Sequence, residues 1–139
     1  MKTVIFIISL LFCHTLYASN DEWEGLILQK MLHSISKNQV IAVYSKDTNL
    51  VHELKNSYSI HTVENCVKCD FILAKDVVES SCDKPTIVFS YYDYLNTPTA
   101  VGVFFWQKGR PTIRFSAKRL KHFKLQVRGE LSKFVSTND

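Results

Sequence analysis

Residues 40–54, VIAVYSKDTNLVHEL, place a short β-branched run directly before a segment with helical spacing. Residues 40–44 have the composition of a buried strand, and Asp47 can cap a helix that begins after it. A strand followed at once by a helix is the repeating unit of α/β domains, so this stretch predicts an α/β fold. The aliphatic residues on one face of the predicted helix are Leu50, Val51 and Leu54.

An amphipathic helix is predicted upstream, over residues 21–37, because apolar residues recur there every three or four positions. A stripe of this kind has to be covered, so the helix is expected to pack on the sheet. The stripe consists of Trp23, Leu26, Ile27, Met31 and Ile35.

Three further strands are predicted downstream, over residues 59–63, 71–74 and 86–90. The first alternates polar and apolar residues, as an edge strand does. The seven residues 76–82 leave room for a short crossover, so the second and third strands are expected to be parallel.

A β-hairpin is predicted over residues 100–106 and 112–115, since Gly109 in the Lys108–Gly109 turn tolerates positive backbone dihedrals. Pro111 cannot donate to a sheet, so it is expected at an edge or in the turn. Helices are predicted over residues 117–123 and 126–135. The second should bury Val127, Leu131 and Phe134. The elements together predict one α/β domain with a mixed sheet of about five to six strands.

The N-terminus is typical of a secretory signal peptide. Lys2 precedes an apolar run over residues 4–12, and the small residue Ala18 precedes a polar stretch. The run is shorter than the roughly 20 residues of a membrane-spanning helix, although a retained anchor is the alternative. We therefore expect cleavage after residue 18, a mature domain over residues 19–139 and a periplasmic location.

Basic residues are concentrated in the last third of the chain. Residues 107–129 contain eight of them and no acid, although the mature chain as a whole carries only +3. In an exported protein such a surface is expected to meet acidic protein, polysaccharide or membrane head groups rather than nucleic acid. An ordinary solvated surface is the alternative.

The mature chain contains three cysteines, Cys66, Cys69 and Cys82, and an oxidising compartment favours a disulfide between two of them. Cys69 paired with Cys66 or Cys82 is the expected bond. The C-x-x-C motif precedes the strand at residue 71, whereas the motif of a thiol-exchange site follows a strand. Thiol exchange is therefore an alternative that this order does not favour. A zinc site formed by the three cysteines and His61 is a further alternative.

No catalytic group can be assembled from the histidines and acids, and no glycine-rich phosphate loop is present, so we expect neither an enzyme nor a bound cofactor. Aromatic residues close the first strand of the hairpin. One of Phe104 and Phe105 should be core and the other outward-facing, because neighbours on a strand alternate. We expect a partner-binding surface made of Phe104 or Phe105, Trp106, Lys108 and Arg110.

Three stretches, residues 63–73, 84–90 and 100–131, carry a similarity in order and spacing to a known family: a cysteine before an apolar strand, a proline-led strand, and a hairpin that continues into helices. In this respect the chain resembles the YfiR-like periplasmic family. The chain departs from the family pattern at two places. Ser116 stands after the hairpin where family members usually have an asparagine, and the usual aromatic–proline pair after the first helix is absent.

The resemblance implies a non-enzymatic, often dimeric periplasmic protein that represses an inner-membrane diguanylate cyclase and whose cysteines report the redox state of the envelope. A homodimer is accordingly an expectation of the resemblance. The alternatives are a docking component of a secretion or motility machine, for which the basic C-terminal third would serve, and a thiol-exchange protein.

Overall fold

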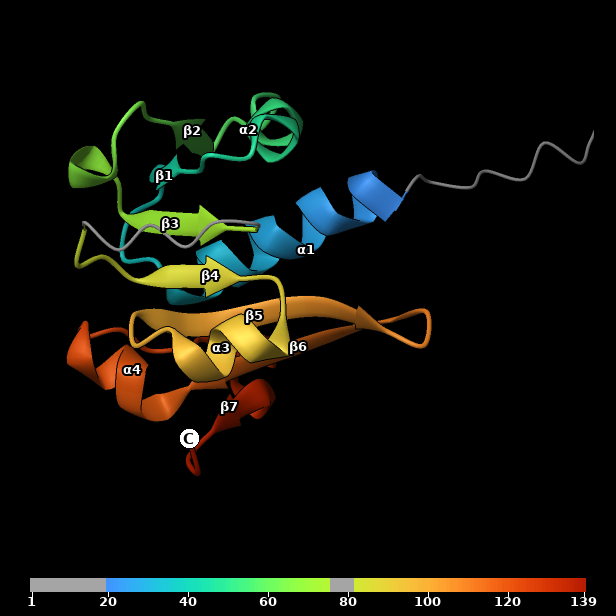
Figure 1. Cartoon of the computed structure of the whole chain (residues 1–139). Helices are drawn as coiled ribbons and strands as arrows, with labels where there is room; N and C mark the ends of the chain where they lie inside the picture. Colours follow the sequence, from blue (N-terminus) through green and yellow to red (C-terminus); the bar gives the residue numbers. More distant parts are fainter. Residues whose placement is uncertain (1–19, 76–81) are drawn as a thin grey trace, which may run out of the picture.

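The computed structural model describes residues 20–75 and 82–139, which form a seven-stranded mixed sheet with helices on both faces (Figure 1). The expected signal peptide, residues 1–18, lies outside the described residues, as does most of the crossover after residue 75. The α/β fold is confirmed. The helices are α1 (Asn20–Ile35), α2 (Thr48–Leu54), α3 (Tyr91–Asn96) and α4 (Ala117–His122), with 3₁₀ helices η2 (Cys66–Lys68) and η3 (Gly129–Phe134).

The strands lie in the order β2-β1-β3-β4-β5-β6-β7. Neighbours from β2 to β5 are parallel, β6 is antiparallel to β5, and β7 is parallel to β6. The expected parallel pairing of residues 71–74 with 86–90 is therefore confirmed, as is the edge position of β2. The strands are β1 (Ile41–Tyr44), β2 (Ile60–Thr62), β3 (Phe71–Ala74), β4 (Thr86–Val88), β5 (Ala100–Gln107), β6 (Arg110–Ser116) and β7 (Val135–Ser136).

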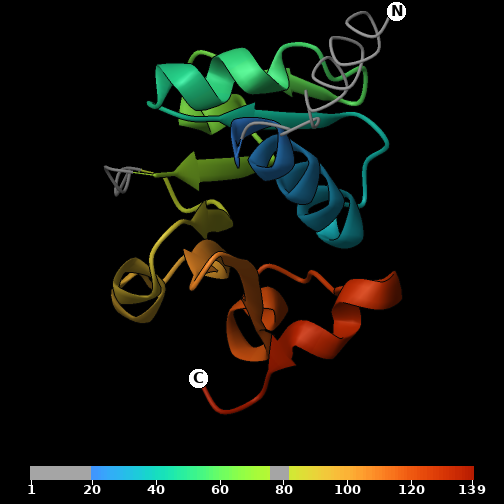
Figure 2. The ribbon, with the colours of Figure 1, turned by 90° about the vertical axis from the view of Figure 1, so that its right-hand side faces the viewer.

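Side chains from the two faces of the sheet form separate cores. The larger core joins α1 and α2 to the sheet and includes Leu120 of α4 and Leu131 of η3. The smaller core lies under α3 and η2 and contains Tyr94 and the cysteines. Figure 2 shows α1 and the C-terminal segment on one side of the sheet and α3 on the other. We call these sides the α1 face and the α3 face.

The exposed side of α1 differs from the prediction. Met31 and Ile35 are buried as expected, but Leu28 and Leu32 complete the buried face, while Trp23 and Leu26 are 52% and 53% exposed. Residues 28, 31, 32 and 35 have the same helical spacing as the predicted stripe, so periodicity alone could not separate the two sets. The contact with the sheet decides between them.

The C-terminal segment is the other correction. Residues 126–135 were expected to be one helix, but a short 3₁₀ helix begins at Gly129, whose φ of 74° no other residue type adopts freely, and β7 follows it. Val127 and Leu131 are buried as predicted, whereas Phe134 is at the surface. Strand β7 brings the sheet to seven strands instead of five to six.

The local predictions at α2 and the hairpin are confirmed. The Asp47 carboxylate accepts a hydrogen bond from the Leu50 N–H at 2.9 Å and so caps α2. Lys108 and Gly109 both have positive φ, 51° and 74°, as a two-residue hairpin turn requires. Within the described residues, no helix is long and apolar enough to cross a membrane.

Gly102 allows β5 to pack closely against its neighbours. The pairing between β4 and β5 is irregular there: Thr86 lies opposite Ala100, and Ile87 lies opposite Gly102, so one residue is bulged. A Cβ atom on Gly102 would lie 3.0 Å from the Ile87 Cδ1 atom and 3.1 Å from the Phe115 ring. A side chain at this position would therefore force the Ile87 and Phe115 side chains of the α1-face core to shift.

We expect Gly102→Val to lower the free energy of unfolding by about 2 kcal/mol, because the added methyl groups overpack this contact. Urea denaturation followed by circular dichroism measures the change. The matched control is Gly25→Val in α1, where an added Cβ meets no atom within 4 Å. Equal stability of the two variants would contradict the close packing at Gly102.

Candidate functional site

The hairpin extends beyond the rest of the sheet as a two-stranded arm. Strand β4 pairs with β5 only as far as Val103, and β7 pairs with β6 only at Phe115 and Ser116. Among the described residues, positions 104–113 thus have no strand neighbour other than each other. Figure 1 shows this hairpin arm projecting past the carboxyl ends of β3 and β4. Such a projection can enter a partner surface without rearrangement of the domain.

The two faces of the hairpin arm differ in character. Trp106 lies opposite Pro111, and Phe104 lies opposite Ile113, which makes the α1 face of the arm apolar. The alternate pairs are Phe105 with Thr112 and Gln107 with Arg110. Because neighbours on a strand point to opposite faces, Trp106 and Arg110 belong to different faces of the arm. The expected surface therefore divides into an apolar and a cationic side.

The aromatic residues of the arm have unequal exposure. Phe104 is a core residue at 1% exposure, and its ring contacts Trp106 edge-on with centroids 5.6 Å apart. Trp106 itself is 40% exposed. Phe105 is half-buried against Tyr91 of α3. Phe104 is thus the core member of the Phe104 and Phe105 pair, and of the three aromatic residues Trp106 is the one that offers a broad accessible ring.

Two lysines have a backbone conformation that usually belongs to glycine or asparagine. Lys108 has a φ of 51° in the hairpin turn, and Lys124 has a φ of 55° just after α4. The Lys124 N–H donates to the Lys121 carbonyl, and the Leu125 N–H donates to the Leu120 carbonyl, which is the pattern of a Schellman helix end. A side chain in this conformation costs about 1 kcal/mol, so each lysine is kept at some expense in stability.

Part of the basic segment serves the fold. The Arg119 guanidinium donates to the backbone carbonyls of Tyr94 and Ala100, and the Arg128 guanidinium donates to those of His33 and Ser36. These carbonyls include the ends of α3 and α1, where a cation is favourable. Arg114 lies over the Tyr91 ring, 5.5 Å from its centroid. The positively charged surface is therefore smaller than the eight basic residues of the sequence indicate. Its exposed members that make none of these contacts are Lys108, Arg110, Lys118, Lys121 and Lys124.

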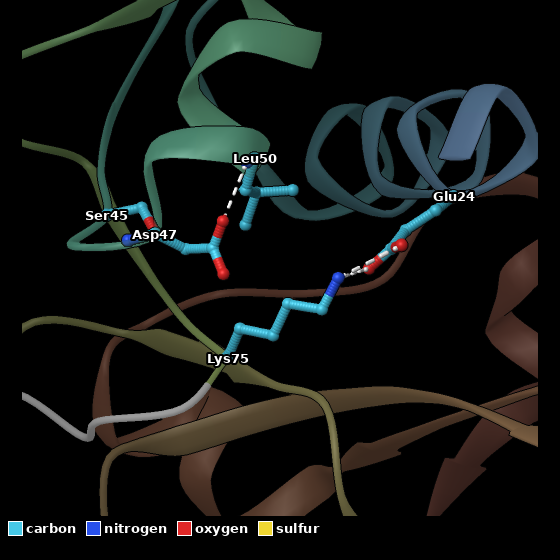
Figure 3. Close-up of polar contacts among 5 residues, drawn as sticks. All are labelled: Glu24, Ser45, Asp47, Leu50 and Lys75. Atoms are coloured by element: carbon cyan, nitrogen blue, oxygen red, sulfur yellow. Dashed lines mark hydrogen bonds and ion pairs between the residues drawn. The ribbon is translucent and has the colours of Figure 1, made fainter. Parts of the chain in front are cut away.

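An ion pair lies at the carboxyl ends of the parallel strands (Figure 3). Lys75, which follows β3, places its Nζ atom 3.0 Å from the Glu24 Oε1 atom of α1. Glu24 is only 7% exposed. Burial lowers the pKa of Lys75, but the hydrogen bond and charge of Glu24, together with Asp47 and Glu53, outweigh it and raise that pKa above the ordinary 10.5.

This ion pair lies beside the point where open α/β sheets usually bind ligands. Strands β2 and β3 lie on opposite sides of β1, so the direction in which the chain crosses the sheet reverses at β1. Ligands of open α/β sheets usually bind at the carboxyl ends of the strands at such a switch point. Here the Asp47 carboxylate caps α2, and Lys75 contacts Glu24. Lys75 and Glu24 thus satisfy each other and fasten α1 to the sheet. This cluster was not predicted from the sequence, where its only signal is a lysine directly after an apolar strand.

The cysteines form one disulfide, as predicted, but not with the expected partner. Cys66 is bonded to Cys82, with Cα atoms 6.1 Å apart, and Cys69 is free and buried. Cys69 ends the η2 turn, where its thiol donates to the Cys66 carbonyl at 3.1 Å and packs into the α3-face core. The expectation that Cys69 is bonded is therefore wrong, because this turn directs its side chain inward.

The remaining thiol is poorly suited to exchange chemistry. Burial raises the pKa of Cys69 above its ordinary value, with the nearby Lys84 opposing the shift and Asp70 adding to it. A reactive thiol needs a lowered pKa and access to solvent. The zinc alternative also loses two of its four ligands, since Cys66 and Cys82 are bonded to each other. Among the described residues, no three histidine, cysteine or acidic side chains lie close enough together to hold a metal.

The sequence was also compared with known proteins. No protein-family model matches the chain, and no curated protein sequence matches it.

Proposed function

We propose that this is an exported, non-enzymatic binding or regulatory protein of the cell envelope, which contacts a protein partner through the hairpin arm. The observation that carries the proposal is the arm itself, which projects from the sheet, exposes Trp106 on one face and Arg110 on the other, and carries Lys108 in its turn. Tryptophan and arginine are the side chains that most often dominate interface energies. The disulfide supports a location in an oxidising compartment.

The resemblance to the YfiR-like family suggests which partner to test first. It favours the periplasmic part of an inner-membrane diguanylate cyclase, which the protein would repress. An acidic surface on that partner would be steered by Lys108 and Arg110, whereas Trp106 would supply buried contact area. The two faces of the arm would then contribute separately to binding. The apolar face would determine the rate of dissociation, and the cationic side would determine the rate of association.

A photo-crosslinking residue placed at Gln107, an exposed position near the tip of the arm, tests the proposal in intact cells. We expect one dominant crosslinked envelope protein. The same residue placed at Tyr58, which is fully exposed next to β2 at the far edge of the sheet, is the matched control and should give no such product. Identical crosslinks from both positions would contradict binding through the arm.

We expect Trp106→Ala to weaken binding of that crosslinked partner at least tenfold, because truncation removes the one broad exposed ring of the arm. Biolayer interferometry with the purified partner measures the change. Tyr58→Ala should bind as the wild-type protein does. Thermal unfolding should show that Trp106→Ala remains folded, and unchanged affinity in a folded variant would place the contact surface elsewhere.

A further inference from the structure

A groove lies between α4 and the C-terminal segment. Figure 1 shows α4 at the opposite end of the sheet from the hairpin arm. Its volume is about 670 Å³, within the range of pockets that bind small molecules. Leu120 and Val127 are buried beneath it, and Leu125 and Val135 are half-buried along it. The groove is therefore lined by four aliphatic side chains.

The charges at the groove all have one sign. Lys121 and Lys124 line it and are exposed, and none of the described lining residues is acidic. Lys118 lies on the same helix but does not line the groove. An apolar lining with ammonium groups is complementary to a molecule that carries both an alkyl chain and an anionic head group.

The backbone at Lys124 is an independent indication that this ammonium group has a use. Lys124 occupies the position of a Schellman helix end where glycine is favoured, and it does so with a φ of 55°. Glycine there would relieve strain, yet the chain keeps a lysine whose side chain lines the groove. Backbone strain retained at a lining position is typical of a residue that takes part in binding.

We propose that this groove binds the anion of a free long-chain fatty acid. The alkyl chain lies along Leu120, Leu125, Val127 and Val135, and the carboxylate accepts hydrogen bonds from the ammonium groups of Lys121 and Lys124. The site is separate from the hairpin arm, so it does not depend on the protein-binding function proposed above. It would allow the protein to respond to free fatty acids in the envelope.

Isothermal titration calorimetry with dodecanoate, kept below its micelle concentration, tests the site on the purified wild-type protein. We expect one dodecanoate bound per chain. Dodecyltrimethylammonium, which has the same chain and the opposite charge, should not bind. Equal binding of the two amphiphiles, no binding of dodecanoate, or binding only to phosphatidylglycerol vesicles would each overturn the proposal.

The variant Lys124→Gly separates binding from folding. We expect it to raise the melting temperature by about 3 to 5 °C, since strain is relieved, and to weaken dodecanoate binding about tenfold. Lys121→Gln should weaken binding to a similar extent and provides the same test should Lys124→Gly not fold. Lys118→Gln is the matched control and should bind dodecanoate normally. Wild-type affinity in both groove variants would overturn the assignment of the carboxylate to these lysines.

Discussion

Lys75→Met should lower the free energy of unfolding by about 3 kcal/mol, because it leaves the Glu24 carboxylate buried without its cation. The Nζ–Oε1 distance is 3.0 Å, and the Glu24 side chain is 9% exposed. Methionine keeps most of the length of the apolar stem and removes the ammonium group, which lies 5.8 Å from the centroid of the Phe89 ring. Urea denaturation at neutral pH measures the change.

A double-mutant cycle shows whether the loss belongs to the pair. Glu24→Gln alone should cost less, because the Lys75 side chain is 35% exposed and can be hydrated. In the double variant Glu24→Gln/Lys75→Met, no buried charge is left unpaired, so stability should recover in part relative to Lys75→Met. Strictly additive losses would contradict a direct interaction between the two side chains.

The same ion pair predicts how stability depends on pH. The pKa of Lys75 is raised in the folded protein, so its contribution is complete below the unfolded value of 10.5 and is lost as the pH rises through the higher folded value. On the alkaline side of neutral pH, the difference in stability between the wild-type protein and Lys75→Met should therefore stay constant up to about 10.5 and shrink above it. A difference that already shrinks near neutral pH would contradict this assignment.

The double variant Cys66→Ala/Cys82→Ala should lose about 3 kcal/mol of stability, because the bond closes a loop between residues 16 positions apart. Both cysteines are replaced so that neither can pair with Cys69. Thermal unfolding with and without a reducing agent measures the effect: the reductant should destabilise the wild-type protein and leave the double variant unchanged. Cys69→Ala is the control, and it should keep its sensitivity to the reductant.

Alkylation identifies the free thiol directly. In protein that lacks residues 1–18, alkylation under denaturing, non-reducing conditions should block one thiol per chain, which mass spectrometry of the digest should assign to Cys69. In the folded protein the same thiol should react slowly, because it is buried and its pKa is raised. Three alkylated thiols in the denatured protein would show that the Cys66–Cys82 bond is absent.

Much of the candidate arm could be predicted from local sequence. The Lys108–Gly109 turn defines the register of the hairpin, and alternation correctly makes one of Phe104 and Phe105 a core residue. Alternation also places Trp106 and Arg110 on opposite faces once the register is known. The position where β4 stops pairing with β5 could not be predicted. Because this pairing ends at Val103, the rest of the arm has no other strand beside it.

By itself, the sequence determined the features that depend on neighbouring residues. The Asp47 cap of α2, the hairpin turn and the short apolar strands all follow from hydrogen bonding and periodicity within a few positions. The presence of a disulfide was likewise predicted from the sequence, on the expectation that the protein is exported, and the pair Cys66–Cys82 confirms it.

Only the tertiary structure decided the features that join distant residues. Glu24 meets Lys75 across 51 positions, and Arg128 reaches the end of α1 across more than ninety. The buried side of α1 and the pairing of β7 with β6 depend in the same way on what packs against them. The physical reason is that helical spacing fits more than one stripe, and a short strand has no stable pairing of its own, so burial against a distant partner makes the selection.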